Sequence, residues 1–134
     1  MAGGAGASAS SKVVKQVVAD LDTNGSSVIA FGAIQVNAKG DNNVTSKAEG
    51  SALGLGAMGM SESVSDSTLN VTSLIGPDTK VTASDGVTVD AYGHSYLSSQ
   101  SNSSSGGLAG GIEGSTSTNI GHVDVEALVG SDVS

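Results

Sequence analysis

The chain has 134 residues with 20 Gly, 1 Pro, no Cys and no Trp, and only 2% of its residues are aromatic. Side chains this small cannot fill a thick globular core, and a hydrophobic content of 37% with regularly spaced Val favours a thin ordered structure over disorder. A net charge of −8 excludes nucleic acid as a partner because nothing neutralises phosphates, and the lack of Cys excludes disulfides and thiol chemistry.

The first residues, MAGGAGASASS, have neither the basic nor the apolar region of a secretory signal peptide. We expect residues 1–11 to form a flexible leader and residues 12–17 to form a cap or entry segment. No apolar run approaches the roughly 18 residues that a membrane span needs, so no span is predicted.

An acidic stretch follows, in which Asp20, Asp22 and Asn24 alternate and Gly25 comes next. Calcium-binding loops begin in this way, but a helix–loop–helix calcium loop also needs a Glu at its twelfth position, where this chain has Phe31. Two interpretations stay open: a calcium site at Asp20, Asp22 and Asn24, or one turn of a repeat with solvated carboxylates. We favour the repeat turn.

An internal repeat dominates the rest of the chain. Residues 17–40 align without gaps with residues 70–93 at a shift of 53, which pairs Val18 with Val71. One extra residue enters near Gly111, after which Val71 corresponds to Val125. We therefore expect one repeat over 18–70, a second over 71–124 and the start of a third over 125–134. Because the chain stops inside a repeat, we expect it to be cut from a longer array.

Within each repeat, apolar and polar residues alternate with a period of two. Val87, Val89 and Ala91 would face one side of a strand, and the residues between them the other side. Several short strands in a repeat of this length predict an all-β fold, a parallel β-solenoid of about six coils of roughly 18 residues each. The small-residue stretches 51–60 and 105–114 are expected to form corners or closely packed strands.

Three stretches resemble repeats of large bacterial surface adhesins of the filamentous-haemagglutinin and leukotoxin-like type. They are VTSLIGPDTKVTASDGVTVDAYG (71–93), SSGGLAGG (104–111) and VDVEALVGSDV (123–133), and the resemblance covers residues 18–134. It implies a right-handed parallel β-helix that serves as an extracellular or cell-surface stalk or fibre. No catalytic residues come with this family.

The residues give no sign of catalysis or of a cofactor. His94 and His122 do not occupy matching repeat positions and have no acid–base partner nearby in the sequence. There is no Arg, and the 13 acidic residues are scattered. We predict a structural protein whose partner is itself, joined head-to-tail through open coil edges.

The alternative is a binding module for glycan or ice that presents Thr and Ser on a flat outer face. Two aromatic residues, Tyr92 and Tyr96, would either stack on a sugar or pack at a corner. The candidate ladder residues are Thr72, Thr79, Thr82, Thr88, Thr116 and Thr118.

Overall fold

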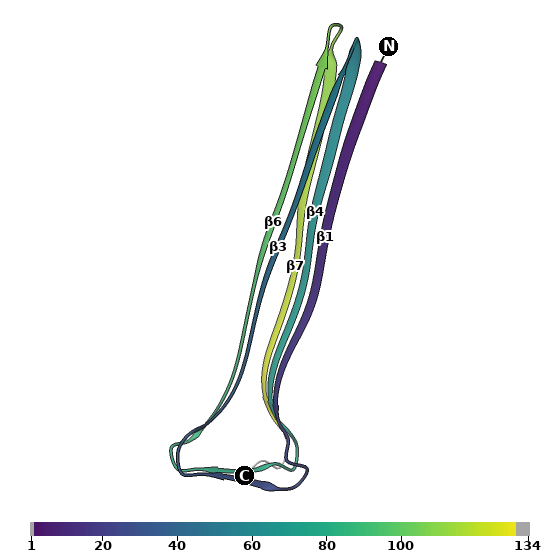
Figure 1. The fold of residues 1–134 in the computed structure, drawn as a ribbon. Helices are drawn as coiled ribbons and strands as arrows, with labels where there is room; N and C mark the ends of the chain where they lie inside the picture. The colour runs from purple at the N-terminus through teal and green to yellow at the C-terminus, as the bar shows by residue number, and fades with distance from the viewer. Residues whose placement is uncertain (1, 131–134) are drawn as a thin grey trace. The chain divides into compact units, whose positions relative to one another are not determined.

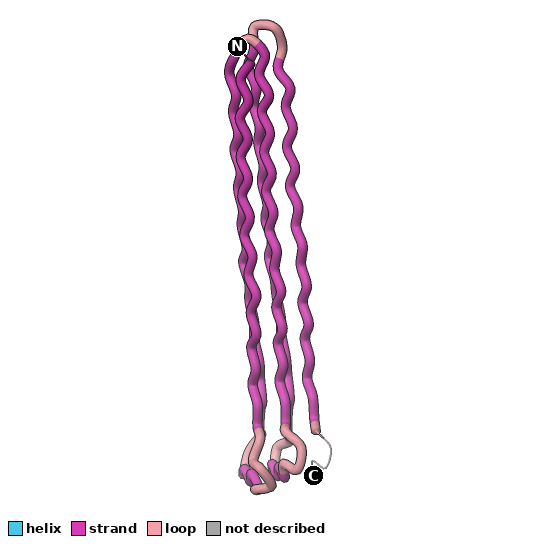
Figure 2. The backbone as a smooth tube through the Cα atoms, turned by 90° about the vertical axis from the view of Figure 1, so that its right-hand side faces the viewer, coloured by secondary structure: helices cyan, strands magenta, loops and turns pink. Residues whose placement is uncertain are grey.

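The computed structural model describes residues 2–130, and every regular element in this part of the chain is a β-strand (Figures 1 and 2). The expected all-β class is thus confirmed. The strands are β1 (Ala2–Leu21), β2 (Ser27–Ala30), β3 (Ile34–Gly54), β4 (Gly56–Ile75), β5 (Lys80–Ala83), β6 (Val87–Gly107) and β7 (Gly111–Val129).

Each strand lies beside its counterpart from the next repeat. The three sheets have the strand orders β1-β4-β7, β2-β5 and β3-β6 (Figure 1). Strands β2 and β5 pair in parallel, with Val28 opposite Val81 and Ala30 opposite Ala83. The fold therefore belongs to the solenoid-like class of parallel strands in stacked sheets, as the sequence predicts.

The coils are much longer than the sequence analysis expects. Val28 pairs with Val81, its equivalent in the next repeat, so one whole repeat separates neighbouring strands. The strands are long as well: β3 and β6 each have 21 residues, β1 and β4 each have 20, and β7 has 19. The error has a physical cause, because the inward residues of the long strands are mostly Gly, Ala and Ser, and such weakly hydrophobic side chains are also typical of loops.

The N-terminal prediction also needs correction. Strand β1 is continuous from Ala2 to Leu21, so residues 2–11, expected as a flexible leader, and residues 12–17, expected as a cap, belong to one strand. The stretches 51–60 and 105–114 do contain corners, because β3 gives way to β4 at Leu55 and β6 to β7 at 108–110. The expected start of a third repeat, 125–134, lies partly outside the described residues, which end at 130.

The register between β1 and β4 differs by one residue from the predicted shift of 53, whereas the register between β4 and β7 agrees with the predicted pairing of Val71 with Val125. Gly76 N donates a hydrogen bond of 2.9 Å to Leu21 O, and Gly130 N donates one of 2.9 Å to Ile75 O, which fixes an offset of 54. A slip of one residue turns every side chain to the other face. Accordingly, Val18 is 53% exposed, whereas Val71, its predicted equivalent, is 1% exposed.

Two compact units divide the described chain, and each contains parts of the long strands. Unit 2 comprises residues 14–42, 68–95 and 122–130. Its interior is mainly apolar: Val36, Ile75 and Val81 form one buried cluster, and Ala38, Leu69 and Val71 form another.

Unit 1 comprises residues 2–13, 43–67 and 96–121, and its interior is small and polar. Ser63, Ser65 and Ser67 of β4 are completely buried. The two faces approach closely here: a Cβ added to Gly59 would lie 2.6 Å from Ser104 O. Apart from Val44, the buried residues between 43 and 67 are Gly, Ala and Ser, the side chains that fit a narrow interior, which accounts for the composition of the chain.

Candidate functional site

The predicted calcium residues lie at the end of β1 and in the loop that follows it. Asp20 is exposed on β1, and Asp22 and Asn24 belong to the loop 22–26. A shallow cavity of about 460 Å³ is lined by Asp22, Asn24, Gly25, Pro77 and Asp78. The structure therefore brings Asp22 and Asn24 together with Asp78, a residue that the sequence motif does not contain.

Local hydrogen bonds account for the polar residues of this loop. Asn24 N donates to Asp22 Oδ1 at 2.9 Å, and Thr23 Oγ1 donates to Ser26 O at 2.6 Å. Asn24 and Gly25 have φ angles of 47° and 82°, the left-handed conformation that these residue types tolerate best. The geometry of the turn by itself therefore explains why Asp22 and Asn24 stand here, without a metal ion.

Within residues 2–130, no three His, Cys, Asp or Glu side chains are grouped so that they could hold a metal ion. The calcium site at Asp20, Asp22 and Asn24 stays the alternative to the repeat turn that the sequence favours. His94 on β6 and His122 on β7 are both exposed.

The candidate Thr residues do not form a single ladder. Thr79 is completely buried in the loop between β4 and β5, where its Oγ1 accepts a hydrogen bond of 3.4 Å from Thr23 N. The other five are spread over different strands: Thr72 on β4, Thr82 on β5, Thr88 on β6, and Thr116 and Thr118 on β7.

One of the two Tyr residues already has a partner. Lys39 Nζ of β3 lies 5.4 Å from the ring centroid of Tyr92 on β6, and it also lies 3.8 Å from Asp41 Oδ2. The cation covers one face of the ring that a sugar would need. Tyr96, further along β6, is 57% exposed.

The edges of the sheets are the most extended polar surfaces of the fold. Strands β1, β2 and β3 form one set of edges, and strands β5, β6 and β7 form the other. A parallel edge strand leaves backbone N–H and C=O groups without a ladder partner. Edges of about 20 residues are long, since strands of 3–10 residues are usual.

Charge is distributed unequally between these two sets of edges. Four of the five Lys residues lie on the first set, namely Lys12 and Lys15 on β1 and Lys39 and Lys47 on β3, where Asp20, Asp41 and Glu49 nearly balance them. Acidic residues prevail on the second set: Asp90, Glu113, Asp124 and Glu126. Sequence reasoning missed this asymmetry because it depends on which long strands are outermost.

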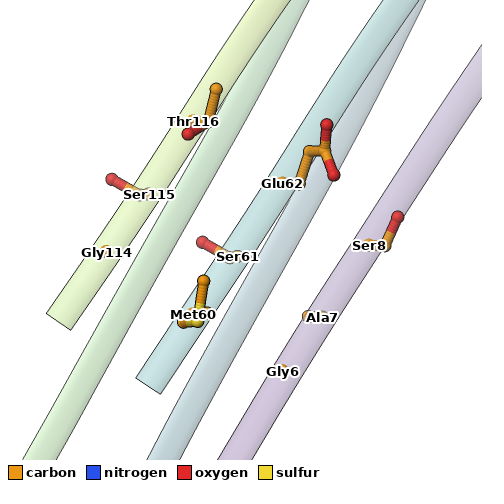
Figure 3. Close-up of a pocket in the computed structure, with 9 residues that line it drawn as sticks. All are labelled: Gly6, Ala7, Ser8, Met60, Ser61, Glu62, Gly114, Ser115 and Thr116. Atoms are coloured by element: carbon orange, nitrogen blue, oxygen red, sulfur yellow. The ribbon is translucent and has the colours of Figure 1, made fainter. Parts of the chain in front are cut away.

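A further hollow lies across three strands of unit 1 (Figure 3). Met60 and Glu62 of β4 project on one side of the sheet, as do Ser8 of β1 and Thr116 of β7 (Figure 3). Gly6 of β1 and Gly114 of β7 have no side chains, so they leave the hollow open on both sides of Met60. The hollow is therefore lined by one large apolar side chain, Met60, and by the polar side chains of Ser8, Glu62 and Thr116.

Comparison with models of known protein families, with curated proteins and with solved structures finds no match to this chain. Among the described residues, no helix is long and apolar enough to cross a membrane.

Proposed function

We propose that the chain is a structural module of a bacterial extracellular stalk or of a self-assembling fibre, built as a right-handed β-solenoid. The observation that carries this proposal is the stacking of one repeat on the next. Each repeat adds one strand to each sheet: Val28 of β2 pairs with Val81 of β5, and β4 lies between β1 and β7. A continuous backbone ladder is mechanically suited to a load-bearing spacer.

Self-association would use the open edges. A second copy can extend the sheets by placing its β1 beside β7, because both strands have unpaired backbone groups along their outer sides. In this head-to-tail arrangement the edge of β1 and β3, where Asp20, Asp41 and Glu49 nearly balance four Lys residues, lies against the acidic residues of β6 and β7. Pairing two edges of β6 and β7 would instead bring like charges together, so charge favours the head-to-tail orientation.

The inner side of β7 supplies an apolar component to the same contact. Val123 and Val125 are 44% and 41% exposed, although their counterparts Leu69 and Val71 are buried. Both valines already pack against Gly93 of β6, where an added Cβ would lie 2.8 Å from Val125 Cγ2. A further strand would complete their burial and add hydrophobic stabilisation.

Negative-stain electron microscopy of the purified chain at micromolar concentration tests self-association. We expect unbranched filaments a few nanometres wide. The variant Val125→Lys should shorten or abolish them because it buries a charge at the joining surface. Thr72→Lys on the central strand β4 adds the same charge away from the edges and should leave them intact. Isolated particles from the unaltered chain would overturn self-assembly and leave the role of a stalk segment.

A further inference from the structure

Six large apolar side chains gather around the two corners of unit 1, and we call them the methionine–leucine surface. Each is between 49% and 94% exposed. Leu55 and Leu108 lie at the corners where β3 gives way to β4 and β6 to β7. Leu53 lies on the outer face of β3, and Met58, Met60 and Ile112 lie on the outer face of the β1-β4-β7 sheet, so the apolar side chains surround this end of unit 1 on both faces. Soluble domains rarely expose so many apolar side chains together without a binding role.

The methionine–leucine surface is grooved as well as apolar. A cavity of about 400 Å³ is lined by Met58, Met60 and residues 2–6, which are only Ala and Gly. A second, of about 430 Å³, lies on the other side of Met58 and is lined by Ile112 and by small residues from all three strands. Flexible Met side chains between glycine floors can adapt to a mobile apolar ligand.

Two of these side chains have an apolar equivalent at the second corner. Leu108 is the repeat equivalent of Leu55 in the register of β2 and β5, and Ile112 is the equivalent of Met58 in the register of the β1-β4-β7 sheet. Backbone hydrogen bonds hold one corner against the other: Ala109 N donates to Leu55 O at 2.8 Å, and Ala57 N donates to Gly110 O at 3.3 Å. Stacking therefore extends Leu55 and Met58 into an apolar ridge with Leu108 and Ile112, whereas the counterparts of Leu53 and Met60 are Gly106 and Gly114.

Charge is absent from the sequence around this ridge. Residues 2–11, 50–60 and 104–112 contain no Asp, Glu, Lys, Arg or His. The first charged residues beyond them include Glu49, Glu62 and Glu113, and the only basic one is Lys12. The Glu113 carboxylate is already bonded to the backbone, since its Oε1 accepts a hydrogen bond of 3.1 Å from Ser105 N.

We propose that the methionine–leucine surface docks on a lipid bilayer whose headgroups carry no net charge. Protruding leucines would enter the boundary between headgroups and acyl chains, and the glycine-floored grooves would take up acyl segments. Because the nearest charges are mostly acidic, an anionic membrane would repel this end of unit 1. This inference goes beyond the stalk function and does not depend on self-assembly.

The exposure of the leucines favours a bilayer over a protein partner. Leu108 is 94% exposed, so it projects away from the chain instead of lying in a flat patch. A protein partner would need a pocket shaped to receive it, as specific interfaces pack to near-interior density. A fluid bilayer needs no such pocket.

Co-sedimentation with phosphatidylcholine vesicles tests the proposal. We expect the unaltered chain to pellet with these vesicles and the double variant Leu55→Ser/Leu108→Ser to bind them at least about ten-fold more weakly, because affinity follows buried apolar area. The matched control is Ile29→Ser/Phe31→Ser, which removes two apolar side chains that are 70% and 99% exposed in unit 2. This control should bind as the unaltered chain does.

Three results would overturn the proposal: no binding to phosphatidylcholine vesicles, an equal loss in both double variants, or tighter binding when phosphatidylglycerol is added at low salt. Sedimentation velocity without lipid tests the alternative that the methionine–leucine surface binds a second copy of the chain. A self-association that the Leu55→Ser/Leu108→Ser variant abolishes, with no vesicle binding, would assign the surface to protein contact. Circular dichroism of every variant shows whether the fold is retained.

Discussion

Gly40 of β3 packs directly onto Val71 of β4. A Cβ added at position 40 would lie 2.7 Å from Val71 Cγ2 and 2.9 Å from Leu69 Cδ1. The contact recurs one repeat later, where a Cβ on Gly93 would lie 2.8 Å from Val125 Cγ2. A glycine on one sheet thus receives the apolar side chains of the other, and this sets the spacing of the sheets in unit 2.

Gly40→Val should therefore destabilise the fold. Its side chain would enter space that Val71 and Leu69 occupy, and overpacking of this kind costs about 1–3 kcal/mol. The measurement is the free energy of unfolding from urea titration. Gly114→Val is the matched control, because nothing lies within 4 Å of a Cβ there and β-branched residues suit a strand. If both variants lose the same stability, the close packing at Gly40 is not the cause.

The acidic loop gives a prediction about metal ions. Asp22 already accepts the Asn24 backbone N–H, so the loop has its structure without calcium. We expect the melting temperature to be the same in EDTA and in millimolar calcium. Asp22→Ala should lower it modestly under both conditions, because one exposed turn hydrogen bond of about 1 kcal/mol is lost. Stabilisation by calcium that Asp22→Ala removes would instead establish a calcium site.

Lys47 and Glu49 make a local prediction about pH. Lys47 Nζ lies 2.7 Å from Glu49 Oε1, and this hydrogen bond and charge, with a smaller contribution from Asn102, lower the pKa of Glu49. A lowered pKa in the folded state means that any stabilisation is present above the unfolded pKa and is lost as pH falls through the folded pKa. Because Glu49 is exposed, the effect on stability is small.

The Glu49 prediction is best measured at the residue itself. An NMR titration of its carboxyl carbon should show a midpoint below the ordinary value of a glutamate side chain, and Lys47→Met should raise that midpoint. An unchanged midpoint in the variant would show that the ion pair is not formed in solution.

The sequence predicts the class of fold better than its dimensions. Alternation in residues 87–91 and the repeat itself indicate parallel stacked strands, because these features report burial directly. The coil length could not be derived in this way. Between Asp41 and Leu69 the inward row is mostly Ala and Ser, and the outward row mixes charged residues such as Lys47 with apolar ones such as Met60. The alternation in hydropathy is therefore not sustained, and one long strand looks like several short ones with loops between them.

Register and the candidate site depend on a similarly small difference. The loop 22–26 has one residue more than the loop 76–79, which converts the offset from 54 in β1-β4 to 53 in β2-β5. A gapless alignment cannot place that residue when the flanking positions are interchangeable Val, Ser and Thr. For the same reason Asp78 could not be recognised beside Asn24, although the two line one cavity.

The buried serines of unit 1 give the last prediction. Ser46 Oγ lies 2.6 Å from Ser63 Oγ and 3.0 Å from Ser65 Oγ, and Ser65 Oγ also donates to Ser98 O at 2.8 Å. Ser46→Ala would leave the completely buried Ser63 hydroxyl without this bond, which costs about 1–3 kcal/mol. Replacing both partners removes the buried polar pair together, so Ser46→Ala/Ser63→Ala should lose less stability than the sum of the two single variants. Urea unfolding of the four proteins in a double-mutant cycle measures this coupling, and additive losses would show that the two hydroxyls do not interact.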